Sequence, residues 1–197
     1  MHGTDFTEAD LSEVKLEKAE LGVDTKLRGA IMCKVDLSDH DLTLIDFSHT
    51  NLTGANLSNT NLHKTIFTWA NLTGAIITGA TISTATVFVG ATLCSVDFSH
   101  FNLSGFNFSQ ANLSHVNLAD AILSPNTQFR EANLTDVDLS SRDLSNMDFQ
   151  RANLTGSNLT GCILNQTILS HSNLTSANLT NGQLSKSTLV DKAIFSK

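Results

Sequence analysis

The stretch NLTGANLSNTNLHKTIF, residues 51–67, places Leu52, Leu57, Leu62 and Phe67 five positions apart. An α-helix repeats every 3.6 residues and a β-strand every two, so a period of five fits neither element. The same period runs through almost all of the 197 residues, interrupted by a few single-residue shifts. The sequence therefore predicts one short unit that is repeated along the whole chain.

Each five-residue unit, or pentad, has a large apolar residue at its centre and a small residue two positions earlier, as Ala55 precedes Leu57. Residues two apart in an extended segment face the same side, so both should point inward. The next two residues are polar and rich in Ser, Thr, Asn and Gly, which is typical of a turn. Very short strands joined by such corners predict a solenoid.

Two patterns indicate that four pentads close one turn of this solenoid. Single-residue shifts follow the pentads centred on Leu21, Ile82 and Leu123, and each completes a multiple of four pentads. A last shift is expected between Leu189 and Phe195. Most phenylalanine centres fall on one side of the four-sided coil, where we expect a core aromatic ladder of Phe6, Phe47, Phe67, Phe88, Phe108, Phe129 and Phe149.

The stretches ANLTGANLSNTNL and ANLSHVNLADAIL resemble the A-[DN]-L-x-x consensus of the pentapeptide-repeat family, and the resemblance covers essentially the whole chain. It implies an all-β fold, a right-handed quadrilateral parallel β-helix of about nine to ten coils. At about 4.8 Å per coil such a helix is on the order of 45 Å long. Residues 1–197 are thus expected to form a single β-helix domain.

Charge and composition narrow the class of partner. The net charge is -7, the pI is about 5.3 and the twelve basic residues are scattered, which argues against direct binding of nucleic acid. The first thirty residues are too charged for a signal peptide, and no membrane contact is expected. Cys33, Cys94 and Cys162 form no CxxC pair, so free thiols and a cytoplasmic location are the interpretation.

No pattern of a catalytic centre is found. The sequence lacks a nucleophile elbow, a phosphate loop and an HExxH motif, and its histidines fall on different sides or coils. We therefore expect no enzyme and no catalytic, cofactor-binding or metal-binding residue. His40, Phe101 and Arg142 occupy inward positions that elsewhere hold small residues. Arg142 is expected either to find a partner such as Asp120 or Asp143 or to push its pentad outward.

An apolar cluster on the outside is the candidate interaction patch. Ile66 and Trp69 flank the centre Phe67, and Val87 and Val89 flank the stacked centre one coil later. An exposed Trp with three branched neighbours is typical of a protein interface. The alternative is an apolar edge that packs only on itself.

Acidic residues are unevenly spread, which bears on the family's best-known role, the protection of DNA gyrase by mimicry of DNA. From His49 to Ala119 the only charged side chains are Lys64 and Asp97, whereas carboxylates gather before residue 25 and after residue 130. The sequence therefore favours a non-enzymatic, rod-like binding or scaffold protein that recognises an unidentified protein partner. A gyrase-protecting DNA mimic of the quinolone-resistance type is the alternative.

Two further expectations concern the surface. Gyrase-protecting members usually dimerise through the C-terminal end, and here Leu184, Leu189 and Phe195 would lack a covering coil, so a homodimer through this end is expected. A third class, binding of a regular lattice such as ice, would use a row of threonines: Thr53, Thr73, Thr135, Thr155 and Thr175.

Overall fold

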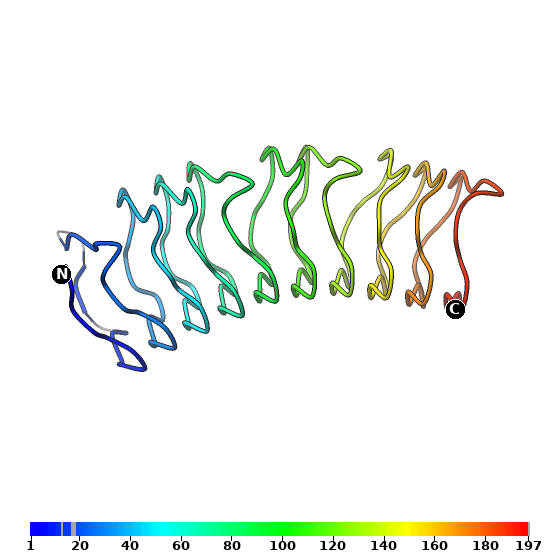
Figure 1. The fold of residues 1–197 in the computed structure, drawn as a ribbon. Coiled ribbons are helices and arrows are strands. Elements are labelled where there is room, and N and C mark those ends of the chain that lie inside the picture. Colours follow the sequence, from blue (N-terminus) through cyan, green and yellow to red (C-terminus); the bar gives the residue numbers. More distant parts are fainter. Residues whose placement is uncertain (13, 17–18, 197) are drawn as a thin grey trace. The chain divides into compact units, whose positions relative to one another are not determined.

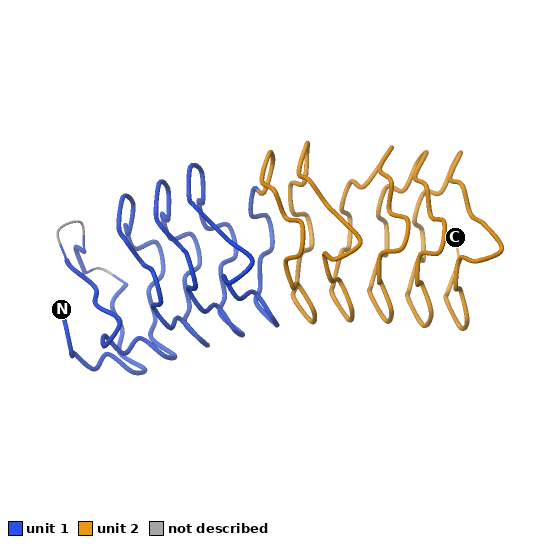
Figure 2. Cartoon of the chain, turned by 45° about the horizontal axis from the view of Figure 1, so that its top comes forward, with its two compact units in different colours: residues 1–97 blue, residues 98–197 orange. Residues whose placement is uncertain are grey.

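The computed structural model describes residues 1–12, 14–16 and 19–196, and the chain forms two compact units, Met1–Asp97 and Phe98–Lys197 (Figure 2). Each unit is a series of similar coils that follow one another along the chain (Figure 1). Over the described ranges there is neither a helix nor a strand; the pairing consists of isolated parallel β-bridges. The expected short strands are thus reduced to a single bridging residue per pentad, because a turn begins two residues later.

The bridges fix the repeat of the coil. Asn51 pairs with Asn71 and Asn56 with Ile76, twenty residues on, and Asn133 pairs with Asn153 in the second unit. Where a corner holds an extra residue the distance becomes twenty-one, as between Ile66 and Val87. Four pentads therefore separate stacked residues in each unit.

The corners are tight turns with one residue in the left-handed region. In residues 52–55 the Leu52 carbonyl accepts a hydrogen bond from the Ala55 N–H at 2.9 Å, and Gly54 has φ 64°. A bond across four residues with positive φ at the third is the pattern of a type II turn. Many corners place other residues there, including Asn59 and Trp69.

At many bridging positions the residue is Asn or Asp, and its side chain caps the following corner. Asn51 Oδ1 accepts hydrogen bonds from the backbone N–H and the hydroxyl of Thr53, at 3.2 and 2.6 Å. Asp41 does the same for Thr43, at 3.1 and 2.5 Å. Because only the Oδ1 atom is needed, amide and carboxylate are interchangeable in this role.

This capping predicts that the stability of the protein falls in acid. Hydrogen bonds from Thr7 lower the pKa of Asp5 to about 2. Similar bonds from Ser12, Ser38 and Thr43 lower the pKa of Asp10, Asp36 and Asp41. For a carboxyl with a depressed folded pKa, the stabilisation is complete above the unfolded value and is lost as pH falls through the folded value.

We therefore expect the melting temperature to fall as the pH drops from about 4 to about 2. The variant Asp10→Asn/Asp36→Asn/Asp41→Asn keeps the Oδ1 acceptors but cannot titrate, so it should lose less on acidification. Circular dichroism melts at pH 7 and in acid check this. An equal loss in the variant and the wild type would mean that the caps do not carry the acid sensitivity.

The core consists of the inward pairs, with phenylalanines stacked in both units. In the first unit, Phe47, Phe67 and Phe88 are buried, and neighbouring ring centroids are 5.5 Å apart. In the second, Phe129 stacks between Phe108 and Phe149 at 5.7 and 5.3 Å. Phe6, which we expected in the same ladder, is only half-buried. The residue at the equivalent position of the next coil is Leu27, because Asp5 bridges Lys26.

Some corners are one residue longer, and each of these contains a buried threonine bonded on both sides. In residues 83–86, Thr86 Oγ1 accepts a hydrogen bond from the Ser83 N–H at 3.1 Å and donates to the Leu62 carbonyl of the preceding coil at 2.7 Å. Thr127 makes the equivalent pair of bonds in residues 124–127.

The last long corner is residues 185–188, which corrects the expected shift between Leu189 and Phe195. Thr188 accepts from the Ser185 N–H at 3.0 Å and donates to a carbonyl of the preceding coil. Leu189 is therefore a bridging residue, 52% exposed, and Val190 is the centre. The prediction was wrong because Leu189 continued the period of five, whereas the hydrogen bonds of Thr188 decide the register.

Candidate interaction surface

The structure brings Ile66, Trp69, Val87 and Val89 together on neighbouring coils of the first unit. Ile66 and Val87 form a parallel bridge, and the Trp69 N–H donates to the Val89 carbonyl at 3.2 Å. Trp69 is 51% exposed, and the other three side chains are half-buried. The four residues, named the Trp69 patch below, lie on two successive coils and are all apolar and at least partly exposed.

Trp69 stands in the corner position with φ 57°. Left-handed backbone is uncommon for a bulky residue in general, but in this fold it is the regular conformation of the corner position. The next coil has Gly90 at the same corner position, also with positive φ. Sequence reasoning did not single out Gly90, although its position one coil after Trp69 was a usable signal.

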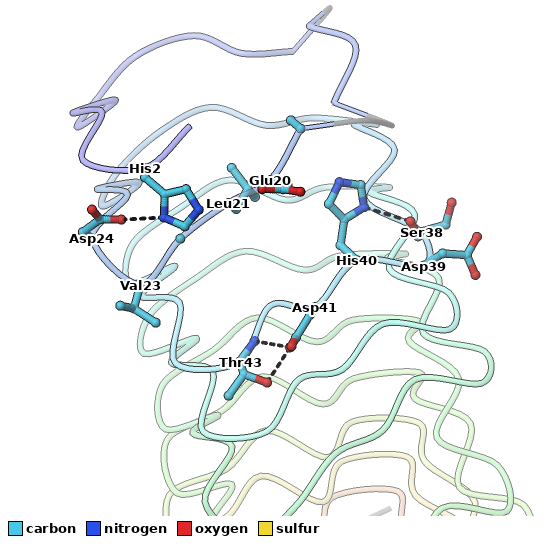
Figure 3. A pocket seen from close by; sticks show the side chains of 12 residues that line it. His2, Glu20, Leu21, Val23, Asp24, Ser38, Asp39, His40, Asp41 and Thr43 are labelled. Atoms are coloured by element: carbon cyan, nitrogen blue, oxygen red, sulfur yellow. Dashed lines mark hydrogen bonds and ion pairs between the residues drawn. The ribbon is translucent and has the colours of Figure 1, made fainter.

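A cavity of about 850 Å³ lies beside His40 in the first unit (Figure 3). The half-buried His40 ring lies between two main-chain oxygens, with Nδ1 2.8 Å from the Ser38 carbonyl oxygen and Nε2 2.9 Å from that of Leu16. Glu20 and Asp39 line the same cavity. The ring thus occupies an inward position with a main-chain carbonyl oxygen close to each of its nitrogens.

Arg142 also occupies an inward position, and its hydrogen-bond acceptors differ from the acidic residues that we expected. Its guanidinium donates to the carbonyls of Ala121, at 2.6 Å, and Leu118 in the preceding coil. The predicted partners Asp120 and Asp143 are not its hydrogen-bond acceptors in these contacts, so that expectation was wrong. The main-chain oxygens of a neighbouring coil lie closer to an inward side chain than carboxylates on the outer face, and sequence spacing alone did not reveal this.

Three carboxylates of the second unit have a lowered pKa: Glu131, which is half-buried, and Asp138 and Asp143, which are exposed. A hydrogen bond from Gln110, followed by those of Arg151, lowers the pKa of Glu131. Hydrogen bonds from Ser140 lower the pKa of Asp138, and those from Ser145 lower that of Asp143. These groups give the second unit negative charge at the surface.

The hydroxyl groups of the threonine row bond to the side-chain amides of the Asn residues beside them. Thr155 Oγ1 donates to Asn153 Oδ1 at 2.6 Å and accepts from Asn173 Nδ2 at 3.0 Å. Asn153 Nδ2 in turn donates to Asn133 Oδ1 at 3.1 Å. Because these hydroxyl donors are used inside the protein, they are poorly suited to order a water lattice.

Groups with chemical reactivity are dispersed. Among the described residues, no three His, Cys, Asp or Glu side chains come together as a metal site. His63 Nδ1 lies 2.8 Å from Ser83 Oγ on the exposed surface, a pair that sequence reasoning missed although both residues follow a centre on the same side. The three cysteines are free, and burial raises the pKa of Cys162.

In the described part of the chain, no helix has the length and apolarity needed to cross a bilayer.

Comparison with known proteins agrees with this repeat. The family model for pentapeptide repeats matches eight copies, over residues 41–79, 86–124, 132–170 and 152–189. No curated protein matches the chain.

Solved structures of similar proteins include QnrB1, a plasmid-mediated fluoroquinolone resistance protein. A trypsin-treated form of it that carries one substitution is 18% identical, with a TM-score of 0.51 over 86% of this chain and 85% of the other. HetL, a pentapeptide repeat protein involved in heterocyst differentiation regulation in the cyanobacterium Nostoc, is 23% identical over 98% of this chain and 87% of its own, with a TM-score of 0.45. At these identities the QnrB1 likeness shows the repeat fold and nothing finer.

Proposed function

This chain belongs to the pentapeptide repeat family, and we propose that it is a non-enzymatic binding or scaffold protein that recognises a protein partner through the Trp69 patch. The observation that carries the proposal is the half-exposed Trp69 ring, together with three partly exposed branched apolar residues on the same two successive coils. Trp residues that become buried at the centre of an interface supply a large share of its binding energy. The surrounding stretch has few charges, so little charge has to be desolvated on binding.

A pull-down from a host lysate tests the proposal, with Trp69→Ala compared with the wild type. Removal of a central aromatic anchor costs about 2 kcal/mol or more, so recovery of the main partner should fall at least about tenfold. Leu44→Ala is the matched control, because Leu44 is 50% exposed and also sits in a corner of the first unit, with φ 64°. Equal recovery by both variants and the wild type would remove the patch from the interface.

The alternative is a DNA mimic that protects DNA gyrase, and the ionised carboxylates of the second unit favour it. A mimic would depend on residues such as Asp136, Asp138 and Asp148, and its binding would weaken steeply with salt. The triple variant with Asn at these positions belongs in the same pull-down. If it loses the main partner while Trp69→Ala keeps it, the mimic becomes the better proposal, and a supercoiling assay with purified gyrase and a quinolone then tests it directly.

Self-association through the last coil is also proposed. Leu184, Val190 and Phe195 are apolar and exposed there, which favours burial against a second copy. Leu189 belongs to the outer row instead and is not part of this end surface. Sedimentation at tens of micromolar, comparing wild type with Phe195→Glu, would show a dimer that the variant loses; a monomeric wild type would contradict it.

From the family resemblance we also propose three finer features of the fold: a right-handed coil, about nine to ten coils, and one domain over residues 1–197. A cytoplasmic location is proposed from the free thiols, which suit a reducing compartment. A crystal structure would decide the first three, and cell fractionation the last.

A further inference from the structure

We propose that Gly90 is a positioning residue that holds the Trp69 indole flat as a preformed anchor, an inference that rests on the proposed function of the Trp69 patch. Gly90 is buried and has φ 69°. A Cβ atom at this position would lie 2.5, 2.6 and 2.7 Å from Cδ2, Cε3 and Cε2 of Trp69. These carbons belong to the fused part of the ring system, so the indole lies directly against the Gly90 backbone, where any other residue would displace it.

The backbone on both sides of this contact is fixed. The Phe67 N–H donates to the Val87 carbonyl at 2.8 Å, and the Trp69 N–H donates to the Val89 carbonyl at 3.2 Å. The corner that carries Trp69 is therefore tied to the coil that carries Gly90. The remaining freedom of the indole is rotation about its side-chain bonds, and contact with Gly90 restricts this rotation.

Other corner glycines of the first unit show that Gly90 has a second role beyond its φ. At Gly74, with φ 62°, an added Cβ would meet nothing within 4 Å. At Gly54 the nearest atom is a flexible Lys34 carbon at 3.4 Å. Positive φ alone thus accounts for Gly74, whereas Gly90 also leaves the space that the ring occupies.

A fixed ring improves binding because less side-chain freedom is lost when the partner docks. Ordering one large side chain costs affinity, and an anchor that is already held avoids this cost. Trp69 keeps about half of its surface exposed in this arrangement. The side that does not lie on Gly90 is the one available to a partner.

The experiment uses the fluorescence of Trp69, which is the single Trp in a chain without Tyr. Gly90→Ala is compared with Gly74→Ala, since both place Ala in a left-handed corner of the same unit. In Gly90→Ala we expect a red-shifted emission maximum, stronger quenching by acrylamide and lower anisotropy, because the ring is pushed into solvent. Gly74→Ala should keep the wild-type emission, quenching and anisotropy.

Folding of both variants is checked by circular dichroism and denaturant titration. If Gly90→Ala does not fold, the pair Gly90→Asn and Gly74→Asn replaces it, because Asn occupies corners with positive φ at Asn59, Asn146 and Asn181. Emission and quenching that are unchanged in the folded Gly90 variant, or changed equally in the Gly74 variant, would overturn the positioning role.

These measurements need no partner, so they separate the two proposals. If Gly90→Ala frees the ring while Trp69→Ala leaves partner recovery intact, the positioning role stands and the patch is not the interface. If Trp69→Ala abolishes recovery while Gly90→Ala leaves the ring in place, the interface stands and the positioning role fails. Where both hold, Gly90→Ala should weaken binding by about three- to tenfold, the cost of ordering one large side chain.

Discussion

Replacing Phe67 by Ala should lower the free energy of unfolding by about 3 to 5 kcal/mol, the range observed when a buried Phe is truncated in a close-packed core. Phe67 is fully buried between Phe47 and Phe88, with both ring centroids at 5.5 Å and both planes within 5° of its own. The ladder cannot close the gap by a small shift, because bridges on each coil hold the neighbouring rings at a fixed spacing.

Denaturant titration followed by circular dichroism measures this loss. Phe67→Leu is the control, since Leu occupies the same inward position at Leu27 and should be tolerated better. A loss below about 1 kcal/mol for Phe67→Ala would mean that the coils collapse around the cavity and that the ladder adds little to stability.

Introducing a charge at an inward position that holds a small residue should lower the free energy of unfolding by a similar amount. Ala132 is 0% exposed, and Ala132→Asp would bury a carboxylate without a cationic partner. Leaving a buried charge unpaired costs about 3 to 5 kcal/mol, and the larger side chain adds steric strain. The variant should therefore unfold at clearly lower denaturant concentration.

Ala132→Ser is the matched control, because the coil two turns later already has a serine at the equivalent position. Ser172 is buried and donates to the Leu169 carbonyl at 2.6 Å, so a hydroxyl at residue 132 has a similar acceptor available from its own turn. We expect this variant to stay within about 1 kcal/mol of the wild type. If Asp and Ser were tolerated equally, residue 132 would have to be solvated, contrary to the structure.

The candidate patch could be assembled from the sequence because it needs only the period of the coil. Ile66 and Val87 occupy the same position in successive coils, so the repeat already predicts that they adjoin. The repeat also places Gly90 one coil after Trp69, but the contact between the indole and the glycine depends on the side-chain rotamer of Trp69, which the period does not specify. The bond between His63 and Ser83 was missed for the same reason.

The sequence by itself determined the repeat, the inward pairs and the number of pentads per turn. These features are local: each pentad must bury one small and one large residue and close its own corner, so the constraint recurs every five positions. The tertiary structure alone decided the acceptors of Arg142, the last long corner before Val190 and the place of Gly90 under Trp69. The period places such residues on adjoining coils, but which of their groups come within hydrogen-bonding or contact distance depends on side-chain conformation and local register, which the period does not specify.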